Sequence, residues 1–360
     1  MPKRIGILTG GGDAPGLNAV IRAVVLTAES RYGWEVVGIP EGFDGLLAGL
    51  PTIPLNSTGV HDLLARGGTI LGAANRGSPF SRPIEKPDGS IELVDVSHEA
   101  VEAIDILGLH ALIVAGGDGT MAIAHKLVLM GAKLIGVPKT IDNDLGETEV
   151  TFGFDTAIRT ATEALEKLQT TAESHHRVMV LEVMGRNAGW IALVAGIAGG
   201  ADAILIPEIP FDIQVVCDKI KSLQKSGRRY SLVVVAEGAT SIDGEQQYYI
   251  YGQTSEKNKL GGIGHMVGDQ LSDCVDAEVR VTVLGHVQRG GPPTPRDRYL
   301  ATTFGASAVD LVAEEKWGHM VAIQGSHVTA VPMEDAVKMK FVETEGDMVK
   351  VARDLGIVFG

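Results

Sequence analysis

Two acidic side chains and a lysine lie close together in one short segment of this 360-residue chain, Pro138-Lys139-Thr140-Ile141-Asp142-Asn143-Asp144. The segment follows an apolar run at 133–137 that predicts a buried strand, so we expect it just beyond that strand's C-terminal end. Open α/β sheets bind their ligands at that edge. Carboxylates there suit metal-assisted group transfer, in which one exchanges a proton and others hold the metal ion. Because Asp and Asn also favour helix N-caps, a capped helix start is the alternative.

Two glycine-rich segments have the same placement in the chain. Thr9-Gly10-Gly11-Gly12-Asp13-Ala14-Pro15-Gly16 follows the apolar run 4–9, and Gly116-Gly117-Asp118-Gly119-Thr120 follows the apolar run 111–115. Glycines let backbone N–H groups approach an anion closely, with a helix N-terminus behind them. Asp118 suits a hydrated Mg²⁺ beside phosphates, or it caps the helix without any ligand. The first segment has neither G-x-G-x-x-G spacing nor the Lys-Ser/Thr pair of a Walker A loop, and a tight turn without a ligand is its alternative.

Basic side chains recur at the ends of later predicted strands and helices. They stand in Ser174-His175-His176-Arg177, in Met184-Gly185-Arg186, and in the stretch from Arg280 through His286 to Arg289. The planar guanidinium group favours phosphate oxygens, although surface salt bridges are the alternative for each arginine taken alone. Glu237 closes another apolar run and could accept hydrogen bonds from sugar hydroxyls, or it could cap a helix. Together with the carboxylates and glycine loops, these residues fit phosphoryl transfer, in which catalysis is mostly positioning and charge stabilisation.

The elements that must position these residues alternate between short apolar runs and amphipathic stretches. Strands are predicted at 4–9, 35–39, 111–115, 133–137, 178–183, 203–206, 232–236, 280–284 and 320–323. Helices are predicted at about 16–30, 120–131, 155–173, 187–198, 213–226, 262–273 and 297–315. Continuous apolar strands separated by helices predict parallel sheets covered on both faces, in an α/β chain with more strands than one sheet holds comfortably. A break is expected near 140–155, and the polar stretch 240–260 should be a surface excursion.

The overall composition argues against some classes of function. The net charge of −14 gives no electrostatic footprint for nucleic acid or an anionic membrane. The 46 glycines exceed the usual share and gather at the ends of apolar runs, as phosphate-binding loops require. Cys217 and Cys274 are expected to pack as free thiols in a reducing cytoplasm rather than to form a disulfide. No apolar run approaches the length of a membrane span, and we expect a cytoplasmic protein.

Five segments in this order, GGGDAPGLNAVIR, GGDGT, PKTIDND, MGR and LGHVQRGG, resemble the 6-phosphofructokinase family. The resemblance covers about residues 4 to 325. It implies two Rossmann-like lobes with the active site in the cleft between them. The lobe for the phosphoryl donor would comprise 1–153 plus about 288–338, and the sugar-phosphate lobe 154–287 plus about 339–360. The implied reaction is Mg²⁺-dependent phosphoryl transfer to the 1-hydroxyl of fructose 6-phosphate, giving fructose 1,6-bisphosphate in glycolysis.

The resemblance also implies a role for each matching residue. Asp142 would be the general base, and Asp118 and Asp144 would hold the metal ion. Gly12, Thr140 and Arg186 would contact the transferring phosphoryl group, with Thr140, Asp142 and Asp144 also beside the sugar. Nucleotide contacts would come from Gly12, Arg76, Gly117, Asp118, Gly119, Thr120 and Lys139. The sugar phosphate would be bound by Arg177, Met184, Gly185, Arg186, Glu237, Arg280, His286 and Arg289.

Two positions bear on the phosphoryl donor. Lys139 stands where the bacterial ATP enzymes usually have glycine and is typical of the pyrophosphate-dependent branch of the family. That branch, however, usually carries aspartate directly after GGD, where this chain has Gly119. A carboxylate at 119 would block and repel the nucleotide α-phosphate, whereas a lysine stem can swing away or pair with phosphate. We therefore expect ATP as the donor, with pyrophosphate as the alternative.

The resemblance further implies an oligomer. In the family, arginines matching Arg177 and Arg280 reach across from a neighbouring subunit, so we expect a homodimer or homotetramer with shared active sites. A non-catalytic sugar-phosphate-binding subunit is a distant alternative, but it would be free to lose its base, and this chain retains Asp118, Asp142 and Asp144. A dinucleotide-dependent oxidoreductase lacks the fingerprint spacing here. An NAD kinase would share GGDGT but would have no use for LGHVQRGG.

Overall fold

A computed structural model of the chain describes residues 2–74, 77–244, 248–249 and 259–360. The chain divides into two compact units, which are described separately below. Unit 1 comprises 1–141, 145–155 and 289–339, and unit 2 comprises 142–144, 156–288 and 340–360. Within the described residues, no helix is both long and apolar enough to cross a membrane.

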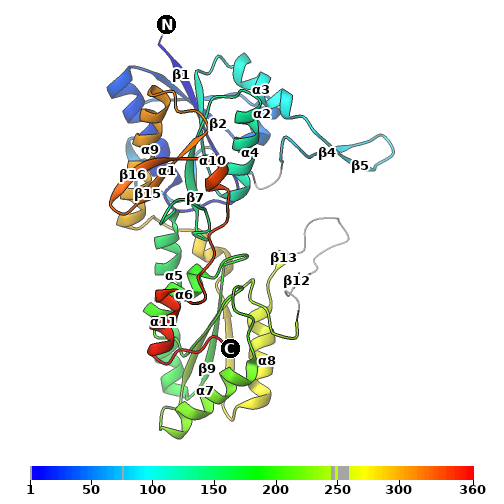
Figure 1. Ribbon diagram of the computed structural model, residues 1–360, viewed down its shortest axis with the longest axis vertical. Coiled ribbons are helices and arrows are strands. Elements are labelled where there is room, and N and C mark those ends of the chain that lie inside the picture. The colour runs from blue at the N-terminus through cyan, green and yellow to red at the C-terminus, as the bar shows by residue number, and fades with distance from the viewer. Residues whose placement is uncertain (1, 75–76, 245–247, 250–258) are drawn as a thin grey trace. The chain divides into compact units, whose positions relative to one another are not determined.

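Unit 1 is built on a mainly parallel sheet flanked by helices (Figure 1). The strand order is β16-β15-β7-β6-β1-β2-β3, and β8 pairs with β7. Its strands are β1 (Arg4–Thr9), β2 (Glu35–Ile39), β3 (Ile53–Leu55), β6 (Ala111–Gly116), β7 (Leu134–Thr140), β8 (Phe152–Gly153), β15 (His319–Gln324) and β16 (His327–Pro332). A separate hairpin pairs β4 (Arg82–Glu85) with β5 (Ile91–Val94). The helices are α1 (Leu17–Thr27), α2 (Gly42–Leu47), α3 (Ser97–Ile106), α4 (Asp118–Leu129), α9 (Pro295–Ala313) and α10 (Met333–Ala336).

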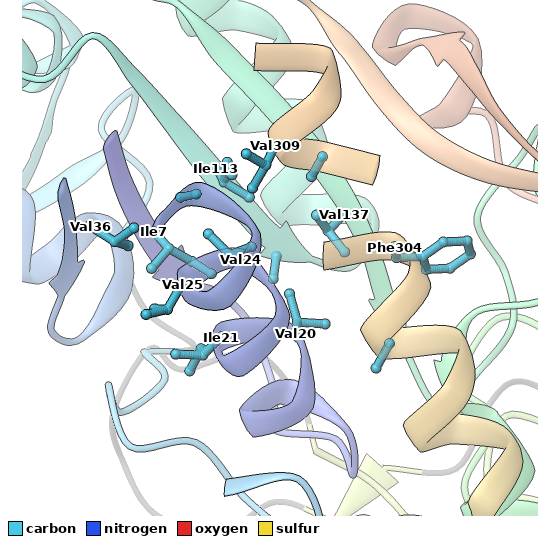
Figure 2. Packing of buried hydrophobic residues seen from close by; sticks show 14 of the residues in the cluster. Ile7, Val20, Ile21, Val24, Val25, Val36, Ile113, Val137, Phe304 and Val309 are labelled. Carbon is cyan, nitrogen blue, oxygen red and sulfur yellow. The ribbon is translucent and has the colours of Figure 1, made fainter. Parts of the chain in front are cut away.

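Side-chain alternation along the strands of unit 1 fills a core on each face of the sheet. Figure 2 shows one core, in which Val24 of α1 and Val309 of α9 pack with Ile7 and Ile113 from the strands. The neighbouring strand residues point the other way, and Leu8 and Leu112 pack there with side chains from α2, α3, α4 and α10. Because both faces are covered, the strands read as continuous apolar runs, and the loops at their ends are left for binding.

Unit 2 contains a parallel sheet with the order β10-β11-β9-β14. Its strands are β9 (Val178–Val183), β10 (Ala203–Leu205), β11 (Ser231–Ala236) and β14 (Val279–Val283), and a short hairpin pairs β12 (Tyr248–Tyr249) with β13 (Lys259–Leu260). Its helices are α5 (Phe154–His175), α6 (Trp190–Ala198), α7 (Ile213–Lys225), α8 (Ile263–Cys274) and α11 (Asp347–Asp354). Helices α7 and α8 cover one face, while α5 and α6 pack on the other. The predicted α/β architecture with mainly parallel, helix-flanked sheets is confirmed.

Two expectations from the sequence are wrong. Strand β7 does not end at 137 but continues through Thr140, because Lys139 and Thr140 pair with Phe152 and Gly153 of β8. The two cysteines do not remain free thiols: Cys217 and Cys274 form a disulfide, with Cα atoms 6.1 Å apart. They come together because α7 and α8 pack side by side on the same face of the unit 2 sheet, although 57 residues separate them in the sequence.

Candidate functional site

The three loops predicted to carry the chemistry of the first lobe meet at one edge of the unit 1 sheet. Strands β1, β6 and β7 are parallel neighbours, with Thr9 opposite Ala115 and Gly116 opposite Pro138. Their C-terminal ends therefore place the first glycine loop, the second glycine loop and the Lys139 segment next to one another. The sequence order alone does not require this, because β2 and β3 come between β1 and β6 in the chain but lie on the other side of β1 in the sheet.

The two glycine loops are packed too tightly to accept a side chain at two positions. The N–H of Gly10 donates to the carbonyl of Ala115 at 2.9 Å. A Cβ at Gly10 would lie 2.7 Å from Cγ2 of Thr120, and one at Gly116 would collide with the same threonine. Thr120, predicted as a nucleotide contact, is buried and fills the space between the loops. These glycines thus allow close backbone approach, which is what an anion-binding loop needs.

Asp118 is the first residue of α4 and is exposed at the helix N-terminus, with Gly117 as the N-cap. The capping alternative for Asp118 is therefore wrong. Its carboxylate makes no hydrogen bond or ion pair within the part of the chain that the structure describes. An exposed carboxylate beside glycine loops suits a hydrated, phosphate-bound Mg²⁺, which proteins usually hold with one or two carboxylates. Among the described residues, no group of three or more His, Cys, Asp or Glu residues is arranged to hold a metal ion.

Gly119 follows in the first turn of α4, and its surroundings are open. Of the described atoms, none lies within 4 Å of where a Cβ at this position would stand. The space beside Gly119, at the N-terminus of α4, is therefore open among the described residues.

Lys139 is a buried residue of β7, with 3% of its surface exposed. Its ammonium group donates a hydrogen bond to the carbonyl of Gly12. The Lys139 carbonyl in turn lies 3.4 Å from where a Cβ at Gly117 would stand. Lys139 thus ties β7 to the first glycine loop.

Arg289 contacts the same loop. Its Nη1 donates to the carbonyl of Asp13 at 3.0 Å and would lie 2.9 Å from a Cβ at Gly12. Arg289 is the first residue of the third segment of unit 1. The structure therefore places this predicted phosphate ligand against the first glycine loop. Arg76, by contrast, lies outside the described residues.

The segment after β7 is a loop and does not start a helix, so the capped-helix alternative is wrong. Thr140 ends β7, and residues 142–144 have no regular secondary structure before β8. Asn143 has a left-handed backbone with φ of 53°, a conformation that Asn tolerates better than most residues. The Lys340 N–H donates to the Asp144 carbonyl at 2.8 Å, which anchors the loop within unit 2. Asn143 and Asp144 are buried, and Asp142 is partly exposed.

In unit 2, the predicted sugar-site residues gather at the C-terminal edge of the sheet. Met184, Gly185 and Arg186 follow β9, Glu237 follows β11, and His286 lies three residues beyond β14. The Glu237 N–H donates to the Val183 carbonyl at 2.8 Å. Arg186 and His286 are exposed, whereas Met184 and Gly185 are buried. A basic side chain, a carboxylate and an imidazole thus share one edge of a parallel sheet, where α/β proteins bind ligands.

Three residues that sequence reasoning missed hold this edge together. Gln288 is fully buried, accepts from the Met184 N–H at 3.4 Å and donates to the Gly285 carbonyl at 3.1 Å. A Cβ at Gly238 would collide with the Arg186 carbonyl. Glu182, buried within β9, accepts from the Gly264 N–H at 2.8 Å, and burial raises the pKa of its carboxyl. A polar residue inside an apolar strand is the signal that could have revealed Glu182.

Replacing Gln288 with Ala should destabilise the protein by about 1–3 kcal/mol, because the Met184 N–H and the Gly285 carbonyl lose a buried partner. Denaturant unfolding measures the effect. The matched control is Gln214→Ala on the exposed surface of α7, for which a change of about 0.5 kcal/mol or less is expected. Equal effects of the two changes would contradict the assigned role of Gln288.

Arg177 and Arg280 lie at the opposite edge of the same sheet. Arg177 directly precedes β9, and Arg280 is the second residue of β14. Since β9 is six residues long, this edge is about 20 Å from the one that carries Arg186 and His286. Within one chain the predicted phosphate ligands are therefore not brought together.

Comparison with known proteins identifies the family of the chain. The Phosphofructokinase family model matches residues 4–312. An ATP-dependent 6-phosphofructokinase of Chloroflexus aurantiacus is 52% identical over 359 residues, 99% of this chain and 98% of that protein. A pyrophosphate–fructose 6-phosphate 1-phosphotransferase of Amycolatopsis methanolica is 47% identical over 95% of this chain and 97% of that protein.

The fold also matches a solved structure. Phosphofructokinase of Pichia pastoris superimposes with a TM-score of 0.80 at 31% identity, covering 99% of this chain and 37% of the Pichia chain. This chain thus spans less than half the length of that structural relative, whereas it matches the two bacterial proteins over nearly their whole length. The resemblance read from the five segments is confirmed, and the chain belongs to the phosphofructokinase family.

Proposed function

We propose that this protein is an ATP-dependent 6-phosphofructokinase, which transfers the γ-phosphoryl group of ATP to the 1-hydroxyl of fructose 6-phosphate. The observation that carries the proposal is the edge of the unit 1 sheet, where the loops after β1, β6 and β7 converge. There two glycine loops adjoin a helix N-terminus bearing Asp118, and the chain continues directly into the loop that holds Asp142. A phosphate-binding edge joined to a carboxylate loop suits phosphoryl transfer better than any redox chemistry.

In this proposal Asp142 takes the proton of the sugar 1-hydroxyl as general base. It is the partly exposed residue of its loop, and the backbone hydrogen bond from Lys340 to Asp144 holds the loop in place. Gly12, Thr140 and Arg186 contact the transferring group. Asp118 and Asp144 would hold Mg²⁺, which when bound neutralises charge on the phosphate oxygens.

The sugar phosphate is assigned to the edge of the unit 2 sheet. Glu237 accepts hydrogen bonds from sugar hydroxyls, and the segment Met184-Gly185-Arg186 lines the same site, supported from behind by Gln288. Cations for the 6-phosphate come from Arg177, Arg280, His286 and Arg289. Thr120 and Gly117 belong to the nucleotide side, with Gly119, Lys139 and Arg76.

Two features of unit 1 support ATP rather than pyrophosphate as the donor. The space beside Gly119 among the described residues leaves room for a nucleotide α-phosphate. Lys139, the residue typical of the pyrophosphate branch, bonds the Gly12 carbonyl and so has a structural task that does not depend on the donor. The Chloroflexus relative is named as ATP-dependent, and the less similar Amycolatopsis relative is named for pyrophosphate.

Incubation of the purified protein with fructose 6-phosphate and Mg-ATP tests the reaction. Phosphorus NMR should show a second sugar phosphate ester at C1 and one ADP for each ester formed. Fructose 1-phosphate in place of fructose 6-phosphate gives the control, since its 1-hydroxyl is already esterified. Absence of the new ester with Mg-ATP would contradict the proposal.

We further propose that two copies of the chain share each active site. The support is the separation of Arg177 and Arg280 from His286, at opposite edges of one sheet. Arg280→Ala should raise the KM for fructose 6-phosphate by roughly 10- to 100-fold with a smaller change in kcat, because it removes binding common to ground and transition states. Steady-state kinetics at varied concentrations of fructose 6-phosphate measures the changes in KM and kcat separately.

Mixed oligomers test whether two subunits share each active site. If Arg280 serves its neighbour's site, an Arg280→Ala subunit beside an Asp142→Asn subunit forms one site with neither change. Denaturing and refolding the two variants together should therefore restore activity at low substrate concentration. Activity no higher than the sum of the two separate variants would contradict shared sites.

A further inference from the structure

The Glu278 side chain links Arg177 and Arg280, at the edge of the unit 2 sheet opposite His286. It directly precedes β14, and the register pairs Val279 with Val178, so Glu278 lies opposite Arg177. The Val178 N–H donates to the Glu278 carbonyl at 3.0 Å, which fixes the two positions side by side. Since side chains two apart on a strand share a face, Glu278 also lies beside Arg280.

Both carboxylate oxygens are engaged. Oε2 of Glu278 accepts from Nε of Arg177, and Oε1 accepts from Nη2 of Arg280. The hydrogen bond from Arg177, followed by the charges of the two arginines, lowers the pKa of Glu278. We call this arrangement, in which the Glu278 carboxylate lies between the two guanidinium groups, the fork. It is also open to solvent, with side-chain exposures of 45% for Glu278, 25% for Arg177 and 59% for Arg280. An exposed ion pair of this kind adds little to stability.

A carboxylate that bridges two guanidinium groups occupies the positions that phosphate oxygens would take. The two arginines and a phosphate dianion have a net charge of zero. With the Glu278 carboxylate also in place, the net charge is negative. Phosphate binding therefore requires Glu278 to leave the fork.

We propose that Glu278 is an internal counter-anion that pairs Arg177 with Arg280 in the free protein and competes with the substrate's phosphate for them. Its role is to set substrate affinity, as a positioning and specificity residue that does not touch the reacting atoms. The inference rests on the proposed function, since it takes the 6-phosphate of fructose 6-phosphate as the displacing group.

Glu278→Gln should lower the KM for fructose 6-phosphate by roughly 3- to 10-fold at unchanged kcat, the size of one screened charge interaction with a dianion. Inorganic phosphate, used as a competitive inhibitor, should bind more tightly by a similar factor. Glu278→Asp keeps the charge and should stay within about 2-fold of the unchanged protein. Glu345→Gln is the matched control, because it removes another exposed carboxylate paired with an arginine, Arg353.

A KM that rises in Glu278→Gln, or equals that of the Glu345 control, would overturn the inference. The rise of Tm with added inorganic phosphate gives a second readout that needs no turnover, and it should be steeper in Glu278→Gln. If the unchanged protein fails to phosphorylate fructose 6-phosphate while this phosphate effect persists, the proposed function fails and the role of Glu278 stands. An equal phosphate effect in both proteins, with sugar phosphorylation intact, contradicts the role of Glu278 alone.

Discussion

Asp142→Asn should lower kcat by about 10²- to 10⁴-fold with little change in the KM for fructose 6-phosphate, the usual range for removing a general base. The amide has nearly the shape of the carboxylate but cannot accept the proton of the 1-hydroxyl. The loop should keep its position, because the backbone bond from Lys340 to Asp144 does not involve the changed side chain. Steady-state kinetics with saturating Mg-ATP measures both constants.

Asp62→Asn serves as the control for loss of one negative charge, since its side chain is exposed in unit 1. It should leave kcat within about 2-fold, as expected of a surface change away from the site. A kcat for Asp142→Asn within about 3-fold of the unchanged protein would mean that another group is the base.

Gly119→Asp should reduce kcat/KM for ATP by about 100-fold or more. A carboxylate at this position faces the nucleotide phosphates, and a tenfold loss requires only about 1.4 kcal/mol of repulsion. The substitution should not disturb folding, because no described atom lies within 4 Å of the new Cβ and an acidic residue suits a first helical turn. Kinetics with ATP varied at saturating sugar, together with Tm, tests both expectations.

Gly119→Ala separates charge from conformation. It adds a methyl group to the same open space and favours the helix, so ATP use should change by no more than a few-fold. Equal losses in the Ala and Asp variants would show that repulsion by a carboxylate is not the cause, and an unchanged kcat/KM in Gly119→Asp would remove Gly119 from the donor site.

The strands that position the site could be predicted because both faces of each sheet are covered. Strands β1, β2 and β9 have the bounds that their apolar runs predict. Strand β7 is longer than predicted because its last residues, Lys139 and Thr140, pair with Phe152 and Gly153 of β8, a contact that a local pattern cannot contain. For the same reason the local pattern predicts Lys139 beyond the strand, although it is buried within it.

What the sequence could not provide depends on contacts between distant residues. The disulfide of Cys217 with Cys274 follows from the packing of α7 against α8. The support that Gln288 gives to Met184, and the fork that Glu278 makes with Arg177 and Arg280, depend on the strand register. The charge of the arginines and their places at the ends of predicted elements predict phosphate ligands. The sheet topology shows that Arg177 and Arg280 lie at the edge opposite His286.

The central claim, that ATP is the phosphoryl donor, is tested most directly by comparing the two donors. The measurement compares kcat/KM for ATP with that for pyrophosphate in the purified protein, with fructose 6-phosphate and Mg²⁺ saturating and fructose 1,6-bisphosphate as the measured product. The open space at Gly119 and the structural task of Lys139 predict that ATP is preferred by at least about 10-fold, or about 1.4 kcal/mol. A higher kcat/KM for pyrophosphate would contradict the account.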